Sequence, residues 1–247
     1  MSFSVNSAWL SGFLLALARA TPWVFITPPF STKGIPLQVK TGFAAALALA
    51  GASHVAGAGL PVGDGAYVVA LFTQLMIGFA IGLTALLLIT AIQGAGSLID
   101  HFAGFNFASF YDPLADVQNT PMGRFYNLLA VTLLFAVNGH LVLVRGFLTS
   151  YEAVPLRGLR FGSVAQLLTH DLGFFLVAAL EVAAPVLAVL FLAEVAMGLL
   201  ARAAPKLNVF MEGFPVRILV GLLLVGVSVP LIGPALGNLV QKAVTGG

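Results

Sequence analysis

Polar and ionisable side chains occur inside otherwise apolar stretches of this sequence. A charge inside a membrane is costly and faces protein or water, so such residues are functional candidates. Two interpretations stay open: a proton or ion relay, as in a secondary transporter, or structural pairing of an arginine with a glutamate inside a helical bundle. A transporter would use Glu181, Glu194 and His140. The full set is Arg19, Asn138, His140, Arg145, Glu181 and Glu194.

Structural pairing is the interpretation that we favour. Secondary transporters are typically built from repeats with paired broken helices, and the sequence shows no such repeat. Enzyme chemistry finds no support either. There is no H-E-x-x-H pair for zinc and no G-x-S-x-G nucleophile, and Gly94-Ala95-Gly96 lacks the third glycine and the following acid of a dinucleotide site. We therefore predict that the protein is not an enzyme and has no catalytic residues, no metal site and no cofactor.

The stretch Gln93–Arg124 interrupts the apolar pattern and is the predicted functional centre. It contains Asp100, Asp112 and Asp116 among the 9 acidic residues of the chain, and a run of aromatic residues interleaved with glycine and polar residues. Such a segment cannot lie against lipid, because an irregular backbone would leave its hydrogen-bonding groups unsatisfied there. It is also too apolar for a solvated loop. We predict that it lies in a cavity, in a pore or on a partner surface formed by protein.

The composition indicates a polytopic membrane protein. Of 247 residues, 60% are hydrophobic and 8% are charged, against about 25% charged in soluble domains. The mean hydropathy is +1.04. The net charge of +2 implies no nucleic-acid partner, and the absence of cysteine excludes disulfides and thiolate metal sites.

Apolar segments approach or exceed the roughly 20 residues that a helix needs to cross a bilayer. Turn residues separate them, among them Pro28-Pro29 and Gly63-Asp64-Gly65. The sequence therefore predicts an all-α membrane protein with about six long apolar helices arranged in hairpins. The segments run over approximately 8–27, 39–58, 67–92, 125–147, 174–200 and 213–240.

Small residues recur in the second and third segments. Gly78 and Gly82 form a small-xxx-small pattern, which lets two helix backbones approach each other closely. We favour packing within this chain, and packing on a partner subunit is the alternative. The second segment is rich in alanine and glycine, which contribute little to membrane insertion but much to tight helix contact.

Five short motifs follow one another along the chain. The longest is R-A-A-P-K-L-N-V-F from Arg202 to Phe210, which leads into Gly213-Phe214-Pro215. The others are Arg19-Ala-Thr-Pro22, Ile35-Pro-Leu-Gln-Val-Lys40, Asp112-Pro113 and Asn138-Gly-His140. Each motif alone is weak, but their order and spacing cover nearly the whole chain. Together they resemble the FliR family, the flagellar members of the type III secretion export-gate proteins.

The resemblance implies a fold and a set of partners. The chain would be a single FliR-type unit over 1–247, with a FliP-like part over about 1–165 and a FliQ-like hairpin over about 166–247. FliR-type proteins join FliP-type and FliQ-type subunits in the flagellar basal body, in the bacterial inner membrane. There, unfolded flagellar proteins enter the secretion channel. Membrane lipid and an FlhB-type component are further expected partners, and nucleic acid is not.

The resemblance also implies a role for the loop after the third segment, which in the family projects into the channel and plugs it. A hydrophobic constriction blocks water and ions by dewetting, yet it can open around a passing chain. Packing of these aromatic side chains in a core or interface is the alternative. The predicted channel-plug residues are Gly104, Phe105, Phe107, Phe110, Tyr111, Asp112 and Pro113.

Basic residues are more frequent in the loops after the first, third and fifth segments than on the other side. The positive-inside rule therefore puts these loops in the cytoplasm. We expect the turn between the fifth and sixth segments to dock another export component there. A passive assembly scaffold, whose loop gates nothing, is a third class of function. The predicted docking turn comprises Arg202, Pro205, Lys206, Asn208, Pro215 and Arg217.

Overall fold

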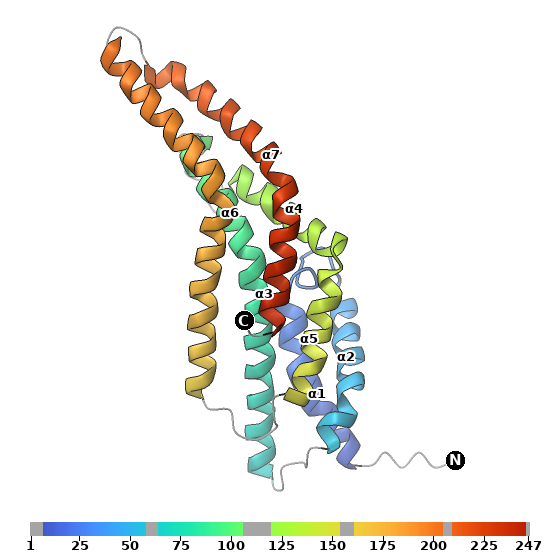
Figure 1. The fold of residues 1–247 in the computed structure, drawn as a ribbon. Helices are drawn as coiled ribbons and strands as arrows, with labels where there is room; N and C mark the ends of the chain where they lie inside the picture. Colours follow the sequence, from blue (N-terminus) through green and yellow to red (C-terminus); the bar gives the residue numbers. More distant parts are fainter. Residues whose placement is uncertain (1–6, 58–63, 106–119, 154–160, 205–208, 246–247) are drawn as a thin grey trace. The chain divides into compact units, whose positions relative to one another are not determined.

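The computed structural model describes residues 7–57, 64–105, 120–153, 161–204 and 209–245. Those residues form α-helices and a few turns, and no strand occurs among them (Figure 1). The prediction of an all-α membrane protein is confirmed. The helices are α1 Ser7–Ile26, α2 Leu37–Gly57, α3 Asp64–Ala103, α4 Pro121–Ala136, α5 Gly139–Ala153, α6 Phe161–Ala203 and α7 Val209–Thr245.

The number of helices differs from the prediction, because the fourth apolar segment forms two helices. α4 ends at Ala136 and α5 begins at Gly139. Asn138, between them, has a left-handed backbone with φ of 56°, a conformation in which asparagine is enriched among residues with side chains. The described part of the chain therefore contains the helices α1 to α7, whereas the sequence predicts about six.

Three of the described helices are long and apolar enough to cross a membrane, over Trp9–Ile26, Gly65–Ala103 and Phe175–Ala203. The number rises to 4 if α4 and α5 together make one broken span. α2 and α7 contain shorter apolar stretches, Leu37–Ala52 and Pro215–Pro230. The expectation of about six spanning segments is corrected accordingly for the described residues.

Two helices are longer than a single crossing requires. α3 has 40 residues and α6 has 43. At the rise of an α-helix, these lengths correspond to about 60 Å, roughly twice the hydrocarbon thickness of a bilayer. Parts of both helices therefore extend beyond one perpendicular crossing and need protein or water around them.

Contacts between residues divide the chain into two compact units. Unit 1 comprises Met1–Leu88, Asn138–Leu172 and Val240–Gly247, and unit 2 comprises Ile89–Val137 and Gly173–Leu239. α3 thus contributes its first part to unit 1 and its last part to unit 2. The predicted division into a FliP-like part and a FliQ-like hairpin is a comparison with other proteins, and it stays a prediction.

The centre of unit 1 is a fully buried arginine. Arg19 of α1 has 0% exposed surface. Its Nε donates a hydrogen bond of 2.6 Å to Oε1 of Gln74 in α3, and its Nη1 donates one of 2.5 Å to the backbone oxygen of Ser150 in α5. The guanidinium carbon lies 4.7 Å from the centre of the Tyr151 ring. Hydrogen bonds and a cation–π contact therefore compensate the burial of this charge and join three helices.

Glycine lets α3 lie directly against α1. A Cβ on Gly78 would overlap the backbone oxygen of Arg19, and a Cβ on Gly82 would be 3.3 Å from the Cα of Trp23. Both glycines are buried. The interpretation of the small-xxx-small pattern as packing within this chain is therefore confirmed.

Aromatic side chains fill the space between α1, α2 and α5. The rings of Trp23 and Phe147 stack with their centres 4.5 Å apart. Phe30, in the turn after α1, contacts Trp23 at 5.6 Å and Phe43 of α2 at 4.9 Å between ring centres. Trp23 and Phe147 are among the largest fully buried side chains. Burial of these rings supplies the apolar part of the unit 1 core, beside the polar contacts of Arg19.

We predict that Gly78→Ala destabilises the protein by about 1–3 kcal/mol, because the added methyl group meets a backbone oxygen that cannot turn aside. Gly42→Ala is the matched control. Gly42 also lies inside a helix, and a Cβ there meets nothing within 4 Å. Alanine is more favourable than glycine in a helix by about 1 kcal/mol, so the control variant should be neutral or more stable. Thermal unfolding in detergent measures both, and equal unfolding temperatures would contradict the packing argument.

Candidate functional site

Polar contacts join the last turns of α3 to the first turns of α4 in unit 2. Nδ2 of Asn127 donates a hydrogen bond of 3.1 Å to Oε1 of Gln93, and Oγ1 of Thr120 donates one of 3.2 Å to Oγ of Ser97. Thr120 is also the N-cap of α4, because its Oγ1 accepts a hydrogen bond of 3.3 Å from the backbone N–H of Gly123. The two helices are thus connected at two successive levels by side chains.

Asp100 is the buried acid of this region, with 0% exposed surface. Its Oδ2 accepts hydrogen bonds from the backbone N–H groups of Met122 at 2.8 Å and Gly123 at 3.0 Å. These N–H groups lie in the first turn of α4, where they have no backbone acceptor within the helix and where the helix dipole favours an anion. Oδ1 of Asp100 is buried and accepts no hydrogen bond from the described residues. We refer to Gln93, Ser97, Asp100, Thr120, Gly123 and Asn127 as the α3–α4 clasp.

Two glycines allow these helices to come so close. A Cβ on Gly96 would be 2.6 Å from the backbone oxygen of Met122. A Cβ on Gly123 would be 2.6 Å from Oγ of Ser97. A side chain at either position would push α3 and α4 apart, so the clasp depends on both glycines as well as on its hydrogen bonds.

The stretch Gln93–Arg124 contains more helix than the sequence predicts. α3 continues to Ala103, and α4 begins at Pro121. The expectation of an irregular backbone is therefore wrong for both ends of the stretch, because their polar and small residues pack one helix against the other. α3 is followed by Gly104, whose φ is 84°. This left-handed backbone conformation commonly ends helices, and glycine adopts it without strain.

The predicted plug residues lie mainly outside the described part of the chain. Gly104 is buried and Phe105 is half-buried at the end of α3. The structure therefore describes the two helix ends that bound this loop, and the plug itself stays a prediction. The residues outside the described ranges are Phe107, Phe110, Tyr111, Asp112 and Pro113.

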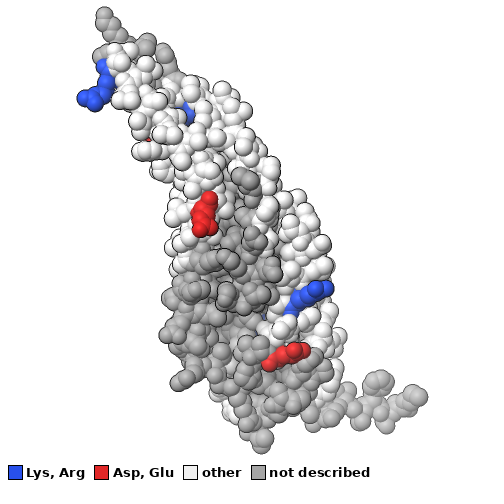
Figure 2. Space-filling model, viewed as in Figure 1, with Lys and Arg blue, Asp and Glu red and all other residues white. Residues whose placement is uncertain are grey.

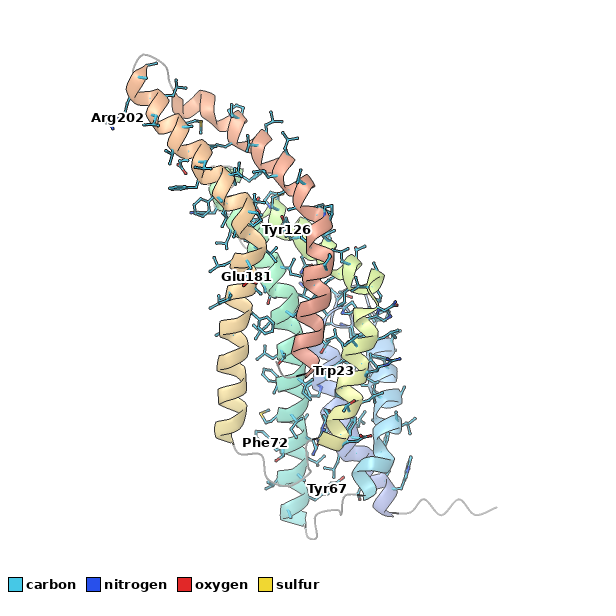
Figure 3. The ribbon with its side chains drawn as sticks, in the orientation of Figure 1. Trp23, Tyr67, Phe72, Tyr126, Glu181 and Arg202 are labelled. Carbon is cyan, nitrogen blue, oxygen red and sulfur yellow. The ribbon has the colours of Figure 1, made fainter. Side chains whose placement is uncertain are left out.

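α6 exposes apolar side chains together with a carboxylate. Leu176 is 62% exposed and Leu180 is 55% exposed. Glu181 is also exposed on this helix (Figure 3). Only 28% of the apolar stretch Phe175–Ala203 is buried by the described residues, and most of the described side chains on the face shown in Figure 2 are uncharged. A carboxylate on such an apolar helix needs polar surroundings.

Residues 10–243 of the chain match the family Bacterial export proteins, family 1. The Flagellar biosynthetic protein FliR of Pectobacterium carotovorum is 32% identical, over 92% of this chain and 87% of that protein. Its namesake from Escherichia coli K12 is 31% identical, also over 92% and 87%. The chain belongs to the FliR family of bacterial export proteins. The prediction from the short motifs is therefore confirmed.

A translocation protein matches a shorter part of this FliR-type chain. Yop proteins translocation protein T of Yersinia pestis is 30% identical over 58% of this chain and 56% of that protein. The FliR of Bacillus subtilis, by contrast, is 31% identical over 89% of this chain and 86% of that protein. The chain is thus a membrane component of the flagellar type III export apparatus.

The polar residues predicted to be buried lie in two different environments in the FliR-type chain. Arg19 is buried in unit 1, and His140 is half-buried at the start of α5. The remaining four lie on the surface of the described chain, so their burial would require a partner. These exposed residues are Asn138, Arg145, Glu181 and Glu194. No group of three or more His, Asp or Glu side chains within the described ranges could hold a metal ion.

The ion pair that forms differs from the pairing expected. Oε1 of Glu194 in α6 lies 3.4 Å from Nη1 of Arg217 in α7, whereas Arg19 binds Gln74 and Ser150. Arg19 and Glu194 belong to different units. Glu194 therefore pairs with an arginine of the predicted docking turn, and arginine–glutamate pairing inside the bundle stays a prediction.

The structure describes part of the predicted docking turn. Arg202 is exposed in the last turn of α6 (Figure 3), and Pro215 is exposed in α7. Arg217 is engaged with Glu194. Docking stays a prediction, because three of its residues lie outside the described ranges: Pro205, Lys206 and Asn208.

Sequence reasoning noted Asp100 as an acid but missed the other members of the clasp. A signal was present, since polar or small residues recur at helical spacing on both sides of the loop. Residues at i, i+4 and i+7 lie on one face of a helix, as do residues at i, i+3 and i+7. The two sets are Gln93, Ser97 and Asp100 on α3, and Thr120, Gly123 and Asn127 on α4.

We predict that Glu194→Gln supports assembly and export better than Glu194→Leu. Glutamine keeps an oxygen that can accept a hydrogen bond from Arg217, whereas leucine leaves a cation without its partner on an apolar surface. The double variant Glu194→Leu with Arg217→Leu should recover part of the assembled complex, because no unpaired cation remains. The readouts are the yield of co-purified complex and the amount of secreted flagellar protein. An assembled Glu194→Gln complex without any export would instead favour a proton relay.

Proposed function

We propose that this chain forms, with FliP-type and FliQ-type subunits, the channel of the flagellar export gate in the bacterial inner membrane. Unfolded flagellar proteins would pass through this channel at the basal body. Residues of about 1–165 would take the FliP-like place and about 166–247 the FliQ-like place in the assembly. The observation that carries the proposal is the outer surface of α6.

That surface suits neither water nor lipid alone. Leu176 and Leu180 would be exposed to water in a soluble arrangement, at a cost of about 25 cal/mol for each Å² of apolar area. In lipid, Glu181 would place a carboxylate in hydrocarbon, which is costly as well. Partner helices that bring both apolar side chains and a polar group would satisfy the two requirements at once. The length of α3 and α6 supports the same arrangement, because helices in such an assembly need not lie wholly within the bilayer.

Co-purification tests the proposal directly. A tagged chain, expressed with the other flagellar export proteins, should be isolated with small polytopic membrane proteins of the FliP and FliQ type. The competing hypothesis is a secondary transporter that uses Glu181, Glu194 and His140. A transporter would bind a solute as an isolated chain, and solute binding without any co-purified subunit would reject the export channel.

The loop that begins at Gly104 is proposed to plug the channel at rest. The aromatic residues of this loop alternate with small or polar ones, so the loop combines apolar bulk with solubility in a lumen. The α3–α4 clasp supports the proposal, because it holds together the two helix ends between which the loop runs. In a scaffold with a passive loop, the aromatic side chains would not be needed to keep the channel closed to ions.

We predict that replacing Phe105, Phe107 and Phe110 together by alanine makes the channel leak ions. The variant removes the apolar bulk of the constriction while leaving the helices that form subunit contacts unchanged. Ion leak or small-solute uptake in cells measures the effect, with assembly checked by co-purification. Phe125→Ala is the control, since Phe125 is 41% exposed on α4 outside the loop. An assembled triple variant as tight as the parent would show that these rings pack rather than plug.

The turn between α6 and α7 is proposed to face the cytoplasm and to dock an FlhB-type component. Basic residues on both sides of the turn support this orientation by the positive-inside rule. Of these, Arg202 is exposed and therefore available to a partner. The energy for export would come from elsewhere in the apparatus, because the sequence contains no nucleotide-binding motif.

We predict that a cysteine at Asn208 reacts with a membrane-impermeant maleimide only from the cytoplasmic side. The chain contains no cysteine, so Asn208→Cys carries the only reactive thiol. Labelling is compared in intact spheroplasts and in inverted membrane vesicles, with the unmodified chain as the control. Labelling restricted to spheroplasts would reverse the proposed orientation and remove the cytoplasmic docking site.

A further inference from the structure

The α3–α4 clasp has a property that general packing does not require. Its contacts recur at three levels, and each level joins one residue of α3 to the N-cap or the first turns of α4. A buried carboxylate is a costly way to join two apolar helices, since an apolar side chain of similar size would avoid the desolvation of the charge. A directional contact, unlike an apolar one, specifies the register of one helix against the other.

The directional contact in the clasp is made by the carboxylate of Asp100. Both N–H groups that its Oδ2 accepts from belong to the first turn of α4, at Met122 and Gly123. The carboxylate thus fixes the start of α4 in position and in rotation, and the close approach at Gly96 limits sliding along α3. Asp100 lies one turn before the end of α3 at Ala103. The two helix ends that enter and leave the loop are therefore held at one place.

We propose that Asp100 is a positioning residue of the export gate, which holds the start of α4 against the end of α3 and so sets where the intervening loop is anchored. This inference rests on the proposed plug function, but the clasp itself can be measured separately. The role belongs to the contact between helix ends and requires no chemistry of the carboxylate during export.

A disulfide can replace the clasp in this cysteine-free chain. The Oγ atoms of Ser97 and Thr120 are 3.2 Å apart, so Ser97→Cys with Thr120→Cys puts two thiols within reach of a bond. Mild oxidation joins the two sulfurs with transfer of two electrons to the added oxidant and loss of both thiol protons, and a reductant reverses the reaction. Each single cysteine variant is a control for cross-links to other proteins.

The first measurement is the rate of this cross-link in the assembled complex. We expect Asp100→Ala to slow it by about tenfold, because the start of α4 loses two charge-assisted hydrogen bonds. Asp100→Asn should lie between the parent and Asp100→Ala, since its amide oxygen can still accept. His101→Ala is the matched control, because His101 is the exposed neighbour of Asp100 on the same helix. Equal rates in Asp100→Ala and in the parent would overturn the proposal.

The second measurement is ion leak in cells. Asp100→Ala should leak, the oxidised disulfide should restore tightness in that variant, and a reductant should remove the rescue. Leak that the disulfide does not correct would overturn the positioning role. Should Asp100→Ala fail to accumulate, Asp100→Asn takes its place in both measurements under the same criteria. A third outcome separates the clasp from the plug. If Asp100→Ala slows the cross-link, but neither Asp100→Ala nor the triple phenylalanine variant leaks ions, the clasp is supported and the plug is rejected.

Discussion

The buried guanidinium of Arg19 is the contact on which unit 1 depends. A cation inside apolar protein is tolerated only where hydrogen bonds and a polarisable neighbour replace water, and Gln74, Ser150 and Tyr151 supply them from α3 and α5. That requirement determines which helices lie together. Gly78 removes the side chain that would keep α3 away from the Arg19 backbone, so the polar contact and the close helix packing depend on each other.

Unit 2 applies the same physical rule to a charge of opposite sign. Asp100 is stabilised by backbone N–H groups that have no backbone acceptor at the N-terminus of α4, rather than by a basic side chain. The hydroxyl of Tyr126 in α4 is likewise buried and shares a hydrogen bond of 3.1 Å with Ser228 of α7. In both units, polar groups inside apolar helices specify which helices meet, while the apolar side chains supply most of the favourable energy.

The surface of α6 carries a charged group that has no such polar partner among the described residues. Where Arg19 and Asp100 find partners within the chain, Glu181 remains exposed on a helix whose neighbouring side chains are apolar. The charged groups of Arg19 and Asp100 thus bind within the chain, whereas Glu181 is exposed in the described structure.

Composition alone determined the class of this protein, since 60% hydrophobic and 8% charged residues cannot cover a soluble fold. Hydropathy placed the helices, and the order of motifs such as Arg202 to Phe210 indicated the family. Only the tertiary structure decided that Glu194 pairs with Arg217, that Gln93 to Ala103 is helical, and that Asp100 holds the start of α4. The physical reason is that hydropathy and helix propensity act along the chain, whereas the partner of a charge depends on which helices pack together. That choice is made by contacts between residues far apart in the sequence, such as Arg19 with Ser150.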